Sequence, residues 1–228
     1  MLFKNRTAAG QFLAGELADY ANRSDVIVLG LPRGGVPVAF EVAKALNAPL
    51  DVLVARKLGV PEQEELAMGA LAKLPGIGPA SGSVRIINEY IVNQANISDE
   101  TIARVAVQEE RELERREQLY RGDRPFPDLR GRTVILVDDG LATGATMWAA
   151  VAAVRREQPA RIVIAVPVAA TETCQELAQA VDDIVCAATP SPFYSVGLWY
   201  EDFPQTTDDE VRDLLAKATN HQPLKVLS

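Results

Sequence analysis

Short β-branched runs alternate with helical patterns along most of the chain, and this alternation constrains the fold more than any other feature. Predicted strands lie at 26–29, 51–55, 134–137, 161–168 and 184–187, and predicted helices at 5–22, 36–46, 146–157 and 173–180. Strands that alternate with helices at short spacing form a parallel sheet with helices on both faces. We therefore predict an α/β fold with a doubly wound, mainly parallel five-stranded sheet.

The segment 56–92 interrupts this alternation. It is rich in glycine and proline and holds two candidate strands, at 66–71 and 84–87. Such a composition predicts a flexible hairpin, a flap of about residues 57–92 that lies outside the core. Ser98 then has the position of an N-cap for a charged helix that runs to about Arg121, and its opposite charges pair at i,i+4. We predict a solvated or interface helix there and assign it no role in binding.

The balance of charge excludes some classes of function. The chain has 23 Lys and Arg against 31 Asp and Glu, for a net charge of −8. Nucleic-acid-binding proteins usually present a basic face, so we expect no nucleic-acid partner. The longest apolar run, 162–170, is far shorter than the roughly 20 residues of a membrane span, and the N-terminus lacks the apolar core of a signal peptide. We expect a soluble cytoplasmic protein with no membrane partner.

Histidine and cysteine are scarce. His221 is the only histidine, and Cys174 and Cys186 are the only cysteines, with no Cys-x-x-Cys pattern. This content excludes a Cys/His zinc site and a disulfide framework. It also disfavours hydrolases that depend on a catalytic histidine. A capping box at 207–210 predicts a last helix.

The residues that can carry chemistry follow the predicted strand at 134–137. Two adjacent carboxylates, Asp138 and Asp139, precede a run of small and hydroxyl-bearing residues, 140–146, that leads into a helix. Two buried, unpaired carboxylates would repel each other, so we expect something to be bound there, such as vicinal sugar hydroxyls or a hydrated metal. The free N–H groups at the start of the helix favour a phosphate. Together these features predict a site for ribose 5-phosphate.

The run VILVDDGLATGAT at 134–146 resembles the signature of the type I phosphoribosyltransferases, which bind phosphoribosyl pyrophosphate. Two more segments resemble that family: GLPRGGV at 30–36 looks like its pyrophosphate loop, and Arg56-Lys57 looks like the basic pair that begins its flexible loop. The resemblance covers nearly the whole chain. It implies a single domain, 1–228, with a core of about 24–190 and a small hood made from 1–23 and 191–228.

The resemblance also implies an activity: magnesium-dependent transfer of the 5-phosphoribosyl group to a nitrogenous base, expected by family analogy to be a nucleobase, with release of pyrophosphate. Asp138 and Asp139 would hold the ribose hydroxyls, and magnesium indirectly through substrate or water. The leaving pyrophosphate would be bound and stabilised by Pro32, Arg33, Gly34, Gly35 and Lys57, with a non-proline cis peptide at or near Arg33-Gly34. The 5-phosphate would be bound by Gly140, Leu141, Ala142, Thr143, Gly144, Ala145 and Thr146.

One position departs from part of the family. Ala142 stands where hypoxanthine–guanine enzymes have an aspartate placed as a general base. An acid of the flap could take that role, or these acids solubilise an exposed loop. The acids in question are Glu62, Glu64 and Glu65.

The aromatic segment 191–203 resembles the part of the family that stacks on the base. Phe193 and Tyr194 either bind the base or belong to a small satellite core, and Trp199 and Phe203 are expected to pack. No residue distinguishes a purine from a pyrimidine acceptor. The alternative function is a non-catalytic regulatory protein that binds phosphoribosyl pyrophosphate. For either function we expect a homo-oligomer, a dimer.

Overall fold

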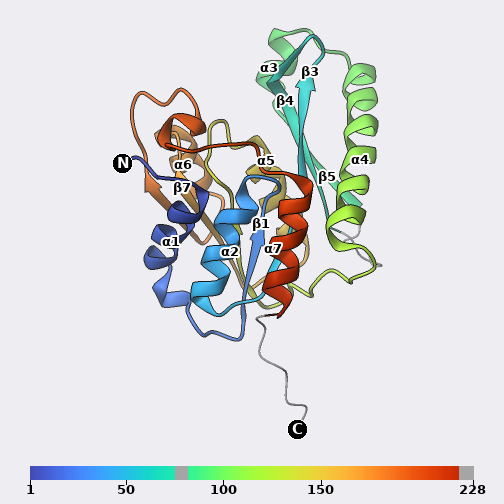
Figure 1. Cartoon of the computed structure of the whole chain (residues 1–228). Coiled ribbons are helices and arrows are strands. Elements are labelled where there is room, and N and C mark those ends of the chain that lie inside the picture. Colours follow the sequence, from blue (N-terminus) through green and yellow to red (C-terminus); the bar gives the residue numbers. More distant parts are fainter. Residues whose placement is uncertain (75–81, 221–228) are drawn as a thin grey trace.

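The computed structural model describes residues 1–74 and 82–220, so His221 and part of the predicted flap (Pro75, Gly76, Gly78 and Pro79) lie outside the described residues. Its centre is a parallel five-stranded sheet in the order β2-β1-β6-β7-β8 (Figure 1). The strands are β1 (Val26–Gly30), β2 (Leu50–Val52), β6 (Thr133–Val137), β7 (Arg161–Val168) and β8 (Asp183–Ala188). The predicted α/β fold class is confirmed.

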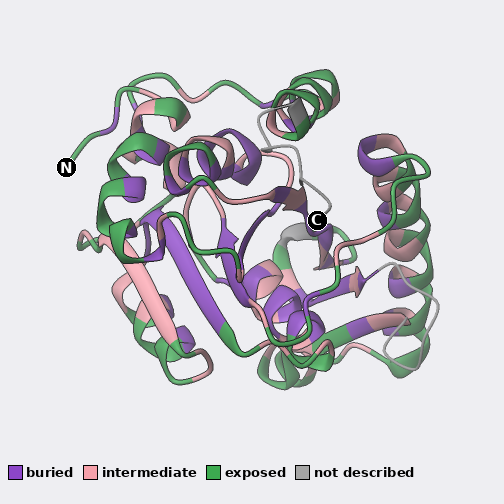
Figure 2. Cartoon of the chain, turned by 90° about the horizontal axis from the view of Figure 1, so that it is seen from below, coloured by how far each residue is buried: buried purple, intermediate pink, exposed green. Residues whose placement is uncertain are grey.

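Helices cover both faces of this sheet. The first face carries α1 (Arg6–Glu16), α2 (Gly35–Leu46) and α7 (Asp208–Asn220), and the second carries α5 (Ala145–Arg156) and α6 (Thr171–Ala178). In β1, Val28 packs in the cluster of the first face and its neighbour Leu29 in the cluster of the second. Figure 2 shows the resulting buried strands between helices whose outer surfaces are exposed. The sheet is therefore doubly wound, as predicted.

The strand order reverses between β1 and β6. Gly30 at the end of β1 is in register with Val137 at the end of β6, so the loops after these two strands leave the sheet side by side. Parallel sheets bind ligands at such a switch point, beyond the carboxyl ends of the strands. The two predicted substrate loops both begin there.

A second, antiparallel sheet follows β2, made of β3 (Ala55–Val60), β4 (Gln63–Leu74) and β5 (Gly82–Ile87). With α3 (Glu89–Gln94) and α4 (Asp99–Arg121) it forms an arm beside the main body, residues 55–74 and 82–121 (Figure 1). The predicted strand 51–55 was wrong at its end: β2 stops at Val52 and Ala55 begins β3. The continuous apolar run from 52 to 55 concealed this break between two sheets.

The prediction that the flap lies outside the core was also wrong. Leu58 and Met68 are fully buried in a cluster with Leu113 of α4. Ala70 and Leu74 pack with α5 residues on the opposite face. Residues 68–72 of β4 are buried on both faces, so this strand lacks the polar alternation of a half-exposed strand. The glycines and prolines of the segment suggested a loop. The helix predicted from Ser98 is confirmed as α4.

The N-terminal segment and the segment after β8 pair with each other. Phe3, which precedes α1, forms a β-bridge with Tyr200, which directly follows η2 (Val196–Trp199). A second short 3-10 helix, η1 (Ala18–Tyr20), follows α1. A small cluster joins these segments: Phe3, Ala9, Val168 and Tyr200, with Phe193, Val196, Trp199 and Phe203 packed against it. The expected packing of Trp199 and Phe203 is confirmed. The hood expected at 1–23 and 191–228 is smaller, because α1 and α7 pack in the core cluster of the first face. From here on, the hood means 1–5 and 191–206.

A disulfide joins Cys174 of α6 to Cys186 of β8. A disulfide framework was excluded on the sequence, and this single bridge was not anticipated, because a spacing of 12 residues does not reveal that α6 packs beside β8. Within 1–74 and 82–220, no helix has both the length and the apolar character needed to cross a bilayer.

Candidate active site

The two carboxylates after β6 each accept a hydrogen bond from within the chain. Asp139 Oδ2 accepts a hydrogen bond from Arg6 Nε at 2.8 Å, and Asp138 Oδ1 accepts one from the Asp139 N–H at 2.8 Å. Arg6 also donates to the Pro204 carbonyl at 2.6 Å, and its guanidinium stacks on Phe203 at 3.8 Å. The expectation that the acid pair needs an external partner is wrong for Asp139, because Arg6 neutralises it.

Arg6 was missed by sequence reasoning. It lies 133 residues from Asp139, in a helix whose pattern indicated only packing. Asn5 caps α1 by accepting from the Ala8 N–H, and the bridge between Phe3 and Tyr200 fixes where the helix begins. The hood therefore places Arg6 at the acid pair.

Burial dominates the electrostatics of this pair. It raises the pKa of Asp138 well above its ordinary value, and the negative charge of Asp139 adds to the effect. Burial also raises the pKa of Asp139, while the charge of Arg6 opposes that rise. The Tyr200 hydroxyl donates to the Asp139 carbonyl at 2.6 Å, so the backbone of the pair is held as well as its side chain. Asp138 is the carboxylate without a basic partner in these contacts.

The loop after the acid pair ends at the first turn of α5. Gly144 precedes the helix with φ +68°, and no side chain caps the first turn. A Cβ on Gly144 would lie 2.7 Å from Thr173 Cγ2, so glycine is required both by the backbone angle and by the space. The Thr173 hydroxyl donates to the Ala142 carbonyl at 2.6 Å, so α6 holds the loop in place. The helix amides are left to bind an anion.

The loop after β1 packs directly against the acid pair. The loop contains a non-proline cis peptide bond between Pro32 and Arg33. This bond is one before Arg33-Gly34, and the cis peptide was expected at or near Arg33-Gly34. A Cβ on Gly34 would lie 1.9 Å from Asp139 Oδ2, and one on Gly35 would lie 2.7 Å from the Val137 carbonyl oxygen. Both glycines are needed for this close approach. The structure thus brings the predicted pyrophosphate and ribose loops into contact.

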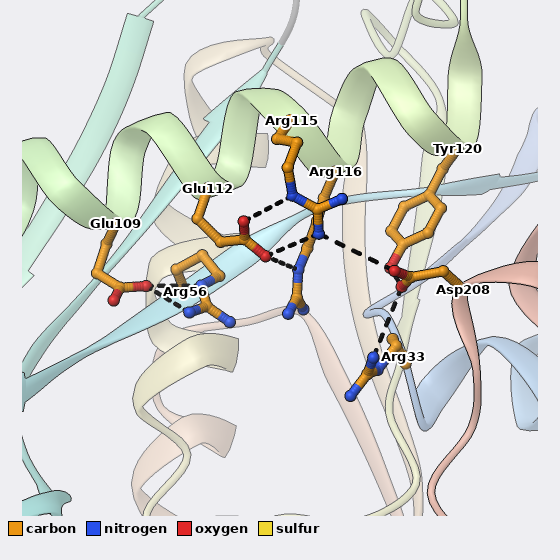
Figure 3. A network of polar contacts seen from close by, with 8 residues as sticks. All are labelled: Arg33, Arg56, Glu109, Glu112, Arg115, Arg116, Tyr120 and Asp208. Carbon is orange, nitrogen blue, oxygen red and sulfur yellow. Dashed lines mark hydrogen bonds and ion pairs between the residues drawn. The ribbon is translucent and has the colours of Figure 1, made fainter.

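Arg33 points from this loop to the arm and to α7 (Figure 3). Its Nη1 lies 3.7 Å from Asp208 Oδ1, and Tyr120 of α4 donates to the same oxygen at 2.5 Å. Arg115 Nη2, also on α4, lies 3.9 Å from Asp208 Oδ2. The helix that was assigned no role therefore contributes side chains next to Arg33.

Arg56 and Lys57 lie in β3, not at the end of a core strand. Arg56 pairs with Glu109 of α4 at 2.6 Å (Figure 3). Successive strand residues point to opposite faces, so Lys57 lies on the face away from Glu109. Among the predicted flap acids, Glu62 is exposed at the β3–β4 turn, and Glu64 and Glu65 lie in β4.

The predicted base-binding residues lie in the hood. Phe193 is partly buried in the aromatic cluster, whereas the Tyr194 side chain is 78% exposed. Val196 packs against Gly140, since a Cβ there would lie 2.6 Å from Val196 Cγ1. The hood thus contacts the loop of the acid pair.

The acidic groups fit only an indirectly held magnesium ion. Across the described parts of the chain, no group of three or more His, Cys, Asp or Glu side chains is placed to hold a metal. Magnesium requires about six oxygen ligands and commonly takes them from substrate phosphates and water, with one or two carboxylates. Asp138 and Asp139 match that smaller contribution.

Comparisons with known proteins agree with this geometry. Residues 2–187 match the family described as "Phosphoribosyl transferase domain". The "Putative phosphoribosyl transferase Rv0571c" of Mycobacterium tuberculosis H37Rv is 45% identical over 217 residues, which are 95% of this chain and 47% of that protein. The chain thus spans about half the length of the curated relatives it matches. The crystal structure of TT1426 from Thermus thermophilus is 39% identical, with a TM-score of 0.76, and the match covers 95% of this chain and 99% of that one.

Proposed function

The chain belongs to the phosphoribosyl transferase family, and on that premise we propose that it is an enzyme that transfers the 5-phosphoribosyl group from phosphoribosyl pyrophosphate to a nitrogenous base. Pyrophosphate is the leaving group. The observation that carries the proposal is the contact between the two loops at the switch point, where Gly34 lies against Asp139. A ribose bearing a 5-phosphate and a 1-pyrophosphate needs sites for hydroxyls and for two anionic groups within one sugar's length of each other.

In this proposal the ribose and its 5-phosphate bind along residues 138–146. Asp138 accepts hydrogen bonds from the ribose hydroxyls, and Arg6 holds Asp139 beside it. The uncapped first turn of α5 binds the 5-phosphate through its amides, with Thr143 and Thr146 adding hydroxyls. The rigid backing by Thr173 and Tyr200 means that little reorganisation accompanies binding.

The pyrophosphate binds at residues 32–35. Backbone amides of this loop and the Arg33 guanidinium stabilise the negative charge that builds as the bond to C1 breaks, and Lys57 contributes from β3. Magnesium, held through substrate oxygens and water next to Asp138 and Asp139, would supply further neutralisation of the leaving group.

The acceptor base approaches C1 from the hood, where Phe193 and Tyr194 are the candidate stacking residues. The test is an assay of pyrophosphate release with phosphoribosyl pyrophosphate, magnesium and a panel of purine and pyrimidine bases. We expect release that depends on one class of base, with a nucleotide formed in equal amount. Binding of phosphoribosyl pyrophosphate with no base-dependent release would overturn the enzyme and favour a regulatory protein.

A further inference from the structure

Three donors from two parts of the chain, the loop after β1 and α4, converge on Asp208 at the start of α7 (Figure 3). Tyr120 donates to its Oδ1 at 2.5 Å, and the guanidinium groups of Arg33 and Arg115 lie on its two oxygens at 3.7 and 3.9 Å. One of these arginines comes from the pyrophosphate loop and the other from α4. Two guanidinium groups and a hydroxyl around an oxyanion are also the donors that suit a phosphate group.

Glu112 holds Arg115 in place. It accepts from Arg115 Nε and Nη2 at 2.7 and 3.0 Å, and from Arg116 Nε at 2.8 Å. This bidentate pair fixes the plane of the Arg115 guanidinium, although 54% of the side chain is exposed. Arg115 is therefore oriented toward Asp208 and remains accessible to a ligand from solvent.

The contacts of Asp208 with the two arginines are long. Charge-assisted N–H···O hydrogen bonds are about 2.7–2.9 Å, so at 3.7 and 3.9 Å neither arginine is tightly bonded to this carboxylate. The short contact is the one from Tyr120. Asp208 thus occupies the space between the arginines without satisfying them, and a dianionic group would bind both more strongly.

We propose that Arg115 and Tyr120 form, with Arg33, the outer half of the pyrophosphate subsite, and that Asp208 is a built-in anion that pyrophosphate displaces from the two arginines. This inference rests on the proposed function, because it assigns the arm's helix to the same leaving group. It gives the arm a role in binding that the sequence did not indicate. It also predicts that Asp208 opposes substrate binding, whereas a purely structural anchor would support it.

The experiment is a calorimetric titration of magnesium pyrophosphate into folded variants, with thermal unfolding measured for each. Asp208→Asn removes the charge but keeps an acceptor for Tyr120, and Asp209→Asn, one residue further along α7, makes the same change of charge at a side chain that is 89% exposed. We expect Asp208→Asn to tighten binding by about three- to tenfold, because it removes a competing anion. Asp209→Asn should change the affinity by less than about twofold.

A second pair of variants tests the arginine. Arg115→Met should weaken pyrophosphate binding by about fivefold or more, and Arg115→Lys should recover part of the loss because it keeps the charge. Arg111→Met, at an exposed position of the same helix, controls for general charge. Weaker binding by Asp208→Asn, or equal effects of Arg115→Met and Arg111→Met, would overturn the inference. Failure of the wild type to bind phosphoribosyl pyrophosphate would instead overturn the proposed function.

Discussion

The two ends of the candidate site are built differently. At the inner end, Arg6 and Asp139 form a pair whose side chains are 11% and 16% exposed, joined at 2.8 Å. At the outer end, Arg33 and Asp208 are 25% and 29% exposed and 3.7 Å apart. A short contact that is mostly buried holds one geometry, whereas a long contact nearer to solvent is weak and exchanges easily. In our proposal, the inner end is preorganised for the ribose phosphate, and the outer end exchanges its anion for pyrophosphate.

The largest effect should come from breaking the inner pair. Arg6→Met leaves Asp139 buried without its counter-charge, so we expect the free energy of unfolding to fall by about 3–5 kcal/mol. Arg23→Met is the matched control, because Arg23 also pairs with an aspartate at 2.8 Å but both side chains are more than 40% exposed. Urea denaturation measures both. Equal losses of unfolding free energy for the two variants would mean that the inner pair contributes no more to stability than an exposed pair does.

The next effect is a dependence of folding stability on pH, caused by Glu117 of α4. Burial raises the pKa of Glu117 on α4 to about 7, against the opposing charge of Arg121, which also contacts Asp51. The folded state therefore holds a proton that the unfolded state releases above the ordinary glutamate pKa of 4.5. Stability should fall by up to about 3 kcal/mol as the pH rises from about 4.5 to 7, and then level off.

Glu117→Gln removes a titrating group and should flatten that part of the pH profile. Glu114→Gln changes an acid of the same helix that is 54% exposed, and its profile should follow the wild type. Denaturation midpoints measured between pH 4 and 8 give the stability profiles of the wild type and the two variants. If the stability of the wild type rises over this window and Glu117→Gln has the same profile as the wild type, then Glu117 is solvated and the account of its burial is wrong.

Most of the inner end was predictable, and the reason is locality. The strand, acid pair and phosphate loop form one continuous run, 134–146, and the glycines of the neighbouring loop are adjacent in sequence. The contacts that close the site are not local: Arg6 and Asp139 are 133 residues apart, Tyr200 and Asp139 are 61 apart, and Tyr120 and Asp208 are 88 apart. A pattern within one window carries no information about such pairs.

The outer end was obscured for a second reason. Glycine and proline in 56–92 suggested a mobile flap, but the glycine at 69 lies where β4 approaches β5: a Cβ there would be 2.3 Å from the Ile86 carbonyl oxygen. In that case glycine marks close packing of strands rather than freedom. The charges of α4 likewise indicated a solvated surface, although Glu109 pairs with Arg56 and Arg115 lies near Asp208.

A smaller effect on stability should come from replacing Gly144 of the phosphate loop with alanine. Gly144 and Gly131 share φ +68°, but a Cβ added to Gly144 would lie 2.7 Å from Thr173, whereas one added to Gly131 would meet nothing within 4 Å. Alanine at either position should incur the left-handed penalty of about 1 kcal/mol. Gly144→Ala should lose about 2 kcal/mol more from overpacking. Equal unfolding free energies for the two variants would show that the loop yields, contrary to a rigid inner end.

The smallest effect should come from the hydroxyl of Tyr200. Tyr200→Phe leaves the Asp139 carbonyl without its donor and should reduce the free energy of unfolding by about 1 kcal/mol. Tyr194→Phe, at a side chain that is 78% exposed, should leave stability unchanged. Denaturation under the same conditions compares them, and a loss in the second variant alone would reverse the assigned roles of the two tyrosines.

The central claim is that the inner end binds the ribose of phosphoribosyl pyrophosphate through Asp138, and calorimetric titration of Asp138→Asn with phosphoribosyl pyrophosphate and magnesium tests it most directly. We expect at least about tenfold weaker binding, because the amide of asparagine replaces one carboxyl oxygen with an N–H donor and so removes an acceptor for the ribose hydroxyls. The free energy of unfolding should not fall, since the half-buried Asp138 has no basic partner in the contacts described. Asp123→Asn, an exposed acid, should bind like the wild type. Unchanged affinity in a folded Asp138→Asn would contradict the claim.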